Sequence, residues 1–162
     1  MIMVSPDMVE LKGERLIVVK QGLALFKDKF RGGVLFRLVG LYVLMMTLIK
    51  HPFTPVYMIS KCFSWKSYIS MKLVSRRTIP SREATPTKME EAIVHAFGRQ
   101  TLRKGEVYDK STYVLHREAS ALRDDVAPLT PEDLENPDIR YFVERNPGWQ
   151  RGMQMVVMST MG

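Results

Sequence analysis

The longest run of apolar positions in this chain covers residues 33–49, which hold ten Leu, Val, Ile or Phe residues and a single charge, Arg37. On the membrane insertion scale the ten apolar residues sum to about −4.5 kcal/mol, whereas Arg37 costs at most ~3 kcal/mol at the bilayer midplane. Arg37 also lies near one end of the run, from where its long side chain can reach the headgroups. The pattern therefore predicts a short transmembrane helix over residues 33–50.

The length of this run is its weak point as a transmembrane helix. Seventeen residues at ~1.5 Å per residue give about 25 Å, which is short for a hydrocarbon core of ~30 Å. A thinner bilayer or protein neighbours would have to cover the difference. The alternative is a buried core helix of a soluble domain, in which Arg37 would need an acidic partner.

The segments on either side of this run show helical spacing of apolar residues. Residues 1–32 form a basic amphipathic N-terminal segment, because apolar residues recur at intervals of three and four at Leu16, Val19, Leu23, Phe26 and Phe30. Residues 51–75 combine helical spacing with aromatic and lysine residues, which is typical of the headgroup level of a membrane. Both segments are predicted to be interfacial helices.

Residues 76–162 are predicted to be a linker followed by an extramembrane, mostly helical docking tail. Thr87 and Glu90 have the spacing of a capping box, which predicts a helix from residue 88. A second helix is predicted over residues 110–123. Asn136 followed by Pro137 predicts the start of a further short helix.

The end of this tail carries large apolar side chains that a small tail cannot bury well alone. We therefore expect Ile139, Tyr141, Phe142 and Trp149 to dock on another subunit. The alternative is that they pack on the preceding helices. The final segment, GMQMVVMSTMG, would either add a strand to a neighbour or pack loosely.

The resulting fold class is mostly α: a single short transmembrane helix flanked by amphipathic interfacial helices, with an extended, mostly helical extramembrane tail. Charge supports this division of the chain. Residues 1–82 carry 14 Lys or Arg and 4 Asp or Glu, whereas residues 83–162 carry 10 and 13. Cations beside an apolar run favour anionic lipid headgroups as partners, so Arg37, Lys50, Lys61 and Lys66 are predicted to contact them, with cardiolipin as the expected phospholipid.

No sequence motif in the chain commits it to a reaction. Phosphate-binding loops, dinucleotide-binding glycine patterns, nucleophile elbows and zinc protease motifs are missing from the sequence. Three histidines and one cysteine do not provide a recognisable ligand set for a metal or haem. The sequence therefore predicts a non-enzymatic protein with no cofactor and no small-molecule substrate.

These observations together predict a non-catalytic accessory subunit of a multi-subunit membrane complex. The specific expectation is a respiratory-chain or ATP synthase complex of the mitochondrial inner membrane, or otherwise another organellar membrane, with other subunits and anionic lipids as partners. The acidic N-terminus does not resemble a cleavable presequence, so an internal signal would be needed. The alternatives are a protein of an organellar ribosome or RNA assembly with a basic N-terminal half, although nucleic acid is the less favoured partner, and a soluble helical adaptor.

Overall fold

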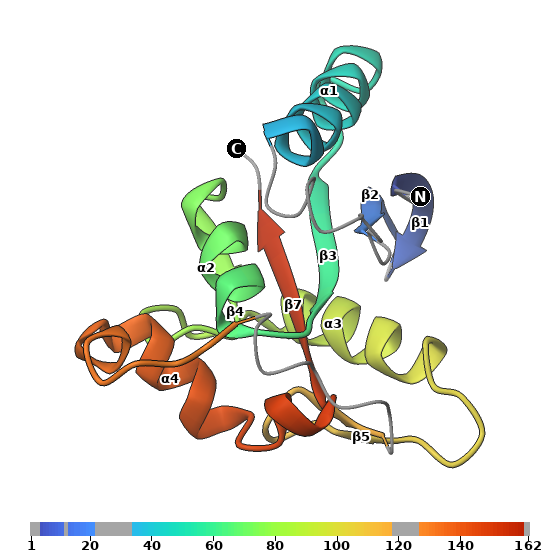
Figure 1. The fold of residues 1–162 in the computed structure, drawn as a ribbon. Helices are drawn as coiled ribbons and strands as arrows, with labels where there is room; N and C mark the ends of the chain where they lie inside the picture. The colour runs from blue at the N-terminus through green and yellow to red at the C-terminus, as the bar shows by residue number, and fades with distance from the viewer. Residues whose placement is uncertain (1–3, 12, 22–33, 118–126, 161–162) are drawn as a thin grey trace. The chain divides into compact units, whose positions relative to one another are not determined.

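The computed structural model describes residues 4–11, 13–21, 34–117 and 127–160, and in helix α1 it describes side chains from Tyr42 onward. These residues contain seven strands together with α-helices and short 3-10 helices (Figure 1). They fall into two compact units: the first unit is Met1–Ser60 with Thr160–Gly162, and the second unit is Lys61–Ser159. The predicted fold class, mostly α, is therefore wrong, because the protein is a mixed α/β protein.

The first unit begins with an antiparallel hairpin of β1 (Val4–Leu11) and β2 (Glu14–Gln21). Gly13 in its turn has a φ of 83°, a conformation that glycine adopts without steric cost. All four residues from Leu16 to Val19 are buried, as expected for a strand whose two faces are both covered. The interfacial helix predicted for residues 1–32 is therefore wrong over these strands, and Leu23, Phe26 and Phe30 lie outside the described residues.

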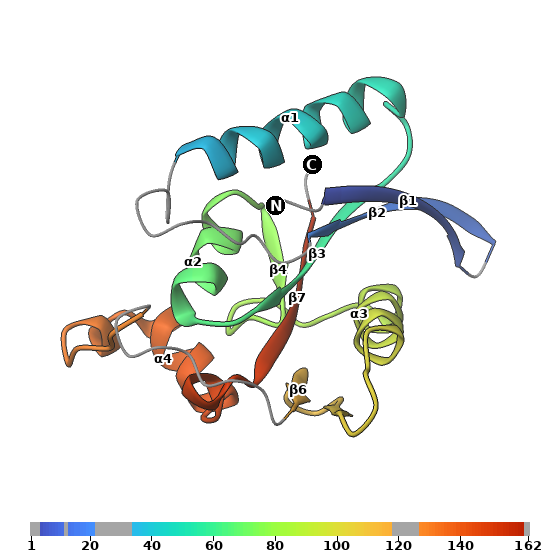
Figure 2. The same ribbon diagram turned by 45° about the vertical axis from the view of Figure 1, so that its right-hand side comes forward.

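The predicted transmembrane segment is the crossover helix of a β-α-β unit. Helix α1 (Val34–Lys50) connects β2 to β3 (Val56–Cys62), and the two strands are parallel, with Ile17 opposite Val56. Parallel neighbours require such a crossover. Leu44 of α1 packs against Ile17, Val19 and Val56 in one apolar cluster, as α1 lies alongside these strands (Figure 2).

The transmembrane prediction is contradicted, since none of the helices in the described part of the chain is both long and apolar enough to cross a bilayer. The physical reason is that a sheet face and a lipid bilayer both reward apolar side chains, so composition alone does not distinguish them. The mitochondrial inner membrane and the respiratory-chain or ATP synthase complexes were inferred from that span. Without it, nothing in the sequence or the structure supports these assignments.

The second unit is built around β7 (Gln154–Thr160), in which residues Met155 to Met158 are completely buried. Strand β7 pairs with β4 (Arg77–Ile79) and antiparallel with β6 (Val114–His116), and β6 pairs with β5 (Val107–Asp109). The methionine-rich final segment, whose role the sequence left open, is thus a core strand of its own chain.

The helical elements of the second unit are α2 (Trp65–Leu73), α3 (Lys88–Gln100), η2 (Asp133–Glu135), α4 (Pro137–Arg145) and η3 (Trp149–Arg151). Two of them, α3 and α4, begin where their capping residues predict. The capping box at α3 is confirmed, with the Glu90 N–H donating to Thr87 Oγ1 at 3.2 Å and the Thr87 N–H donating to Glu90 Oε2 at 2.7 Å. Asn136 caps α4 as predicted, accepting the Asp138 N–H at 2.9 Å.

Two other helix predictions in this part of the chain are wrong. Residues 51–75 form strand β3 and then helix α2, so a strand occupies much of the predicted interfacial helix. Of the helix predicted over residues 110–123, the described part contains strand β6 instead, and residues 118–123 lie outside the described residues. In both cases residues distant in sequence complete a sheet, which a local pattern does not reveal.

Candidate functional site

The face of α1 that points away from the strands carries an exposed row of apolar side chains. Tyr42, Met45 and Ile49, which we call the outer stripe, are 65%, 48% and 67% exposed. Their spacing of three and four residues places them on one side of the helix. Leu44 and Thr47, on the other side, are buried. Helix α1 is therefore apolar on both faces, although the strands cover only one.

A turn directly after α1 adds a fully exposed phenylalanine to this surface. Pro52 follows His51 in the turn, and the Thr54 N–H donates to the His51 carbonyl oxygen at 3.2 Å. Proline favours the second position of such a turn because its φ is already set. The turn holds Phe53 in solvent with 98% of its surface exposed. Phe53 thus adds a large apolar side chain to the exposed surface of the first unit.

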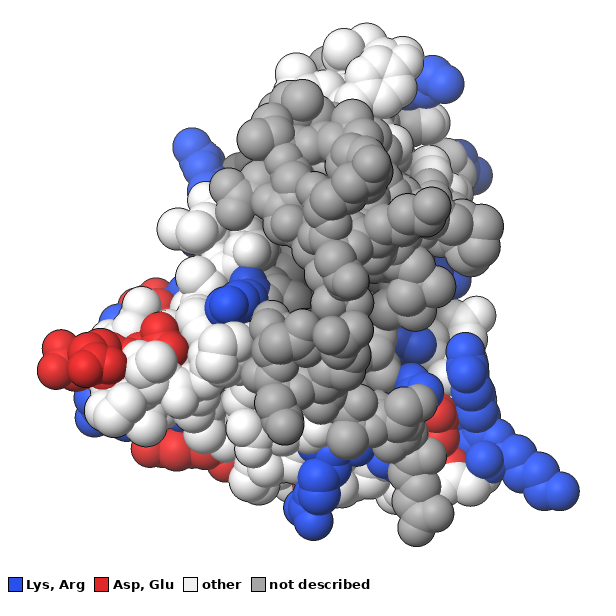
Figure 3. Space-filling view, in the orientation of Figure 1, with Lys and Arg blue, Asp and Glu red and all other residues white. Residues whose placement is uncertain are grey.

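The stretch of sequence that carries this surface, residues 29–82, has charges of one sign. Asp28 and Glu83 are consecutive acidic residues in the sequence, so residues 29–82 contain no carboxylate side chain. Lys50, in the last turn of α1, is exposed beside the outer stripe. Over α1, the described atoms visible in Figure 3 are white or blue, with no red among them. The surface therefore combines apolar side chains with positive charge.

The four basic residues predicted to contact headgroups do not lie in one unit. Lys50 is beside the outer stripe, and Arg37 is in α1 with a side chain outside the described residues. Lys61 and Lys66 belong to the second unit. The Lys66 ammonium lies 5.3 Å from the centre of the Trp65 ring, so it takes part in a cation–π contact within the chain.

The residues predicted to dock on another subunit are placed inside the second unit. Ile139, Phe142 and Trp149 are buried, and Tyr141 is half-buried. The Phe142 ring centre lies 5.6 Å from that of Tyr68 and 6.4 Å from that of Trp149. Other parts of the chain thus cover this apolar surface, with rings of α2 and η3 beside Phe142, whereas the alternative prediction was packing on the helices from residue 88 and over residues 110–123.

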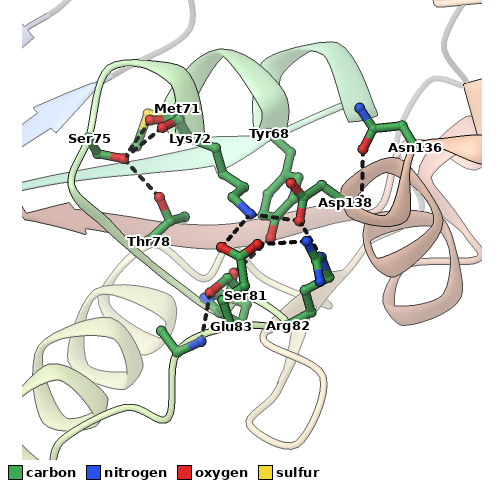
Figure 4. Close-up of polar contacts among 12 residues, drawn as sticks. Tyr68, Met71, Lys72, Ser75, Thr78, Ser81, Arg82, Glu83, Asn136 and Asp138 are labelled. Carbon is green, nitrogen blue, oxygen red and sulfur yellow. Dashed lines mark hydrogen bonds and ion pairs between the residues drawn. The ribbon is translucent and has the colours of Figure 1, made fainter.

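A network of charged side chains joins α2, α4 and the segment after β4 (Figure 4). Lys72 Nζ lies 2.6 Å from Asp138 Oδ1 and 3.3 Å from Glu83 Oε2, and Arg82 Nε lies 3.1 Å from Asp138 Oδ1. The Tyr68 hydroxyl donates to the Pro80 carbonyl oxygen at 3.1 Å, and burial raises the pKa of this tyrosine. Two cations face two carboxylates, so the charges of the network balance and its ion pairs link these elements.

A second polar group contains His95, which forms a hydrogen bond between Nδ1 and the Tyr108 hydroxyl at 2.9 Å. The Tyr113 ring stacks on His95 at 5.1 Å between ring centres. Burial lowers the pKa of His95, and Lys110 and Arg99 act in the same direction against Glu91. A Cβ on Gly98 would lie 2.6 Å from the Tyr108 ring, so this glycine allows the ring to approach α3. These contacts hold the β5–β6 hairpin against α3.

Comparison with known proteins does not add an identity to this geometry. No family model, curated protein or solved structure matches the chain. Among the described residues no group of three or more His, Cys, Asp or Glu side chains is arranged to hold a metal ion.

Sequence reasoning missed the outer stripe as a surface because it assigned all of α1 to one apolar environment, whereas the helix has a covered face and an exposed face.

Proposed function

We propose that this protein is a non-catalytic attachment protein, which binds an anionic lipid surface through the outer stripe of α1 and Phe53. The observation that carries the proposal is the exposed row of Tyr42, Met45 and Ile49, continued by the fully exposed Phe53. Helix α1 would lie along the headgroups with its covered face still on the strands. This arrangement differs from a membrane-spanning helix, which the structure contradicts.

The chemistry of the surface supports lipid as the occupant. Tyrosine and phenylalanine suit the membrane interface, where an apolar ring enters the acyl boundary and a hydroxyl remains hydrated. Lys50 adds about 1 kcal/mol near an anionic surface. A second copy docked by the same surface would bring another Lys50 toward Lys50, whereas an anionic headgroup would neutralise it.

The expected strength of this contact is modest. Removing each of the four exposed apolar side chains from water contributes about 1–2 kcal/mol. With about 1 kcal/mol from Lys50 the gross contribution is about 5–9 kcal/mol, and the cost of association lowers the net binding toward the marginal level that one myristoyl chain gives. Attachment through this surface alone would therefore be reversible, which agrees with a role as one component of a larger assembly.

Vesicle flotation tests this proposal. The protein should float with vesicles that contain phosphatidylglycerol and much less with pure phosphatidylcholine vesicles. Replacing both exposed residues, Ile49→Asp with Phe53→Asp, should lower the partition coefficient at least about tenfold, because the apolar contact is lost and two negative charges are added. Circular dichroism and urea unfolding would verify that this variant is folded.

Val107→Asp is the matched control for this experiment. Val107 is 64% exposed, similar to Ile49, but it belongs to β5 in the second unit. Its replacement adds one of the two negative charges of the double variant, outside the outer stripe and Phe53, and should leave flotation unchanged. Failure of the unaltered protein to float with anionic vesicles, or an equal loss in Val107→Asp, would contradict the proposal and favour a protein or RNA partner.

A further inference from the structure

The middle residue of the outer stripe, Met45, carries a thioether that is open to water. Its side chain is 48% exposed and comes between Tyr42 and Ile49 on the uncovered face of α1. Methionine differs from leucine and isoleucine in this sulfur, which oxidants convert to a sulfoxide. The surface that we assign to lipid therefore contains a side chain that oxidation changes from apolar to polar.

This exposure distinguishes Met45 from nearly all methionines that the structure describes. Of these methionines, only Met8 and Met45 are exposed. The buried ones are Met58, Met71, Met155 and Met158, and the half-buried ones are Met46, Met89 and Met153. A buried thioether is shielded from oxidants in water, so a mild oxidant should select the two exposed methionines.

The single cysteine does not compete for the oxidant. Cys62 is buried, and burial raises the pKa of its thiol to about 12. Peroxides react with the thiolate, which is scarce at neutral pH when the pKa is raised. The redox chemistry of the described surface therefore belongs to thioethers.

We propose that Met45 is an oxidation site through which peroxides weaken the attachment of this protein to anionic lipid. The inference rests on the proposed function and adds a regulation of the same surface. In the reaction the sulfur–oxygen bond forms as the oxygen–oxygen bond of hydrogen peroxide breaks; the sulfur loses two electrons, and the second oxygen leaves as water with both protons. The sulfoxide is polar, so its transfer from water into the acyl boundary is unfavourable.

Oxidation at this position should change the surface without unfolding α1. The helix is held on the strands by its other face, where Leu44 packs against Ile17, Val19 and Val56. On the exposed face of the free protein, water can hydrate the sulfoxide of Met45. Methionine sulfoxide reductases reverse the reaction, so the apolar stripe can be restored.

Flotation with phosphatidylglycerol vesicles, before and after treatment with hydrogen peroxide, tests this site. Fragmentation of tryptic peptides in a mass spectrometer should locate sulfoxide at Met45 and Met8, with Met58 and Met155 unchanged. The partition coefficient should fall about tenfold, because a hydrated group replaces one apolar contact of the stripe. Circular dichroism should show that the treated protein is folded, and methionine sulfoxide reductases with a thiol reductant should restore flotation.

Two leucine variants locate the effect, each compared with its own untreated sample. Met45→Leu removes the thioether and keeps an apolar side chain, so peroxide should not change its flotation. Met8→Leu is the matched control, because Met8 is the other exposed methionine, and peroxide should lower its flotation as in the unaltered protein. Met45→Gln, which is polar and lacks the sulfur, should float weakly without any peroxide.

An equal loss after peroxide in Met45→Leu would assign the effect to another methionine and overturn the proposal. A treated protein that carries the Met45 sulfoxide and floats as before would overturn it too, as would a Met45 that peroxide does not oxidise. These results leave the attachment surface in place. Failure of the untreated protein to float with the same vesicles contradicts the attachment surface itself, so the two proposals can fail separately.

Discussion

At the scale of single residues, the hydrogen-bond partners of Glu90 stabilise its buried negative charge. Its buried carboxylate accepts hydrogen bonds from Arg77 Nε at 2.8 Å and Arg77 Nη2 at 3.2 Å, in addition to the capping bond from Thr87. Burial alone would raise the pKa of Glu90, but the hydrogen bonds from Arg77 and Thr87 outweigh it and the pKa is lowered. The ionised carboxylate therefore stabilises the folded protein.

The lowered pKa of Glu90 determines how the free energy of unfolding should vary with pH. Because the folded pKa is lowered, the contribution of Glu90 is complete above the ordinary value of 4.5 and is lost as the pH falls through the lowered folded value. Glu90→Gln keeps a capping side chain but should cost about 2 kcal/mol in the free energy of unfolding at pH 7. Urea unfolding at a series of pH values measures this, and the cost should shrink below pH 4.5.

Glu91→Gln provides the comparison for this prediction. Glu91 is the neighbouring carboxylate on α3 and has no ion-pair partner within the described residues. Its replacement should change the free energy of unfolding by less than about 0.5 kcal/mol. A cost for Glu90→Gln that stays constant down to pH 3, or that equals the cost of Glu91→Gln, would show that the buried pair with Arg77 does not supply this stability.

Single residues also show which local signals could be read from the sequence. Thr87 with Glu90 and Asn136 with Pro137 predict helix starts correctly, because a cap acts within four residues of itself. The partner of Lys72 could not be read in this way, because Asp138 is 66 residues further along the chain and lies near Lys72 only in the folded protein.

Among the elements, α1 shows that a run of apolar residues does not by itself specify whether a helix faces lipid or a protein core. Its apolar residues were consistent with lipid or with a core, and the deciding contact is the packing of Leu44 on Ile17, Val19 and Val56. That contact depends on the parallel pairing of β2 with β3, which are separated by the whole helix in sequence. Strand β2 was missed for a related reason, since a strand buried on both faces lacks alternation.

The two faces of α1 should differ in their effect on stability. Leu44→Ala should lower the free energy of unfolding by about 2–5 kcal/mol, because it leaves a cavity against the strands. Ile49→Ala, on the exposed face, should change it by less than about 0.5 kcal/mol. Urea unfolding compares the two variants. Similar costs for both would mean that α1 does not rest on the strands by the face described here.

For the whole molecule, positive charge and the exposed outer stripe occur in the same half of the chain. Residues 1–82 carry 14 Lys or Arg against 4 Asp or Glu, and the outer stripe and Phe53 lie within the stretch of that half without carboxylates. The aromatic side chains of the second half, in contrast, fill the core of the second unit. The sequence predicted a spanning helix where the structure has a crossover helix with one covered and one exposed face.

The most direct test of the account is to ask which residue enters the lipid. Phe53→Cys can be labelled selectively with an environment-sensitive fluorophore, because the native Cys62 is buried and burial raises the pKa of its thiol to about 12. On addition of phosphatidylglycerol vesicles, the label at position 53 should brighten and shift to shorter wavelength, whereas a label at Val107→Cys should not change. Equal spectra with and without vesicles at position 53 would contradict the proposed attachment surface.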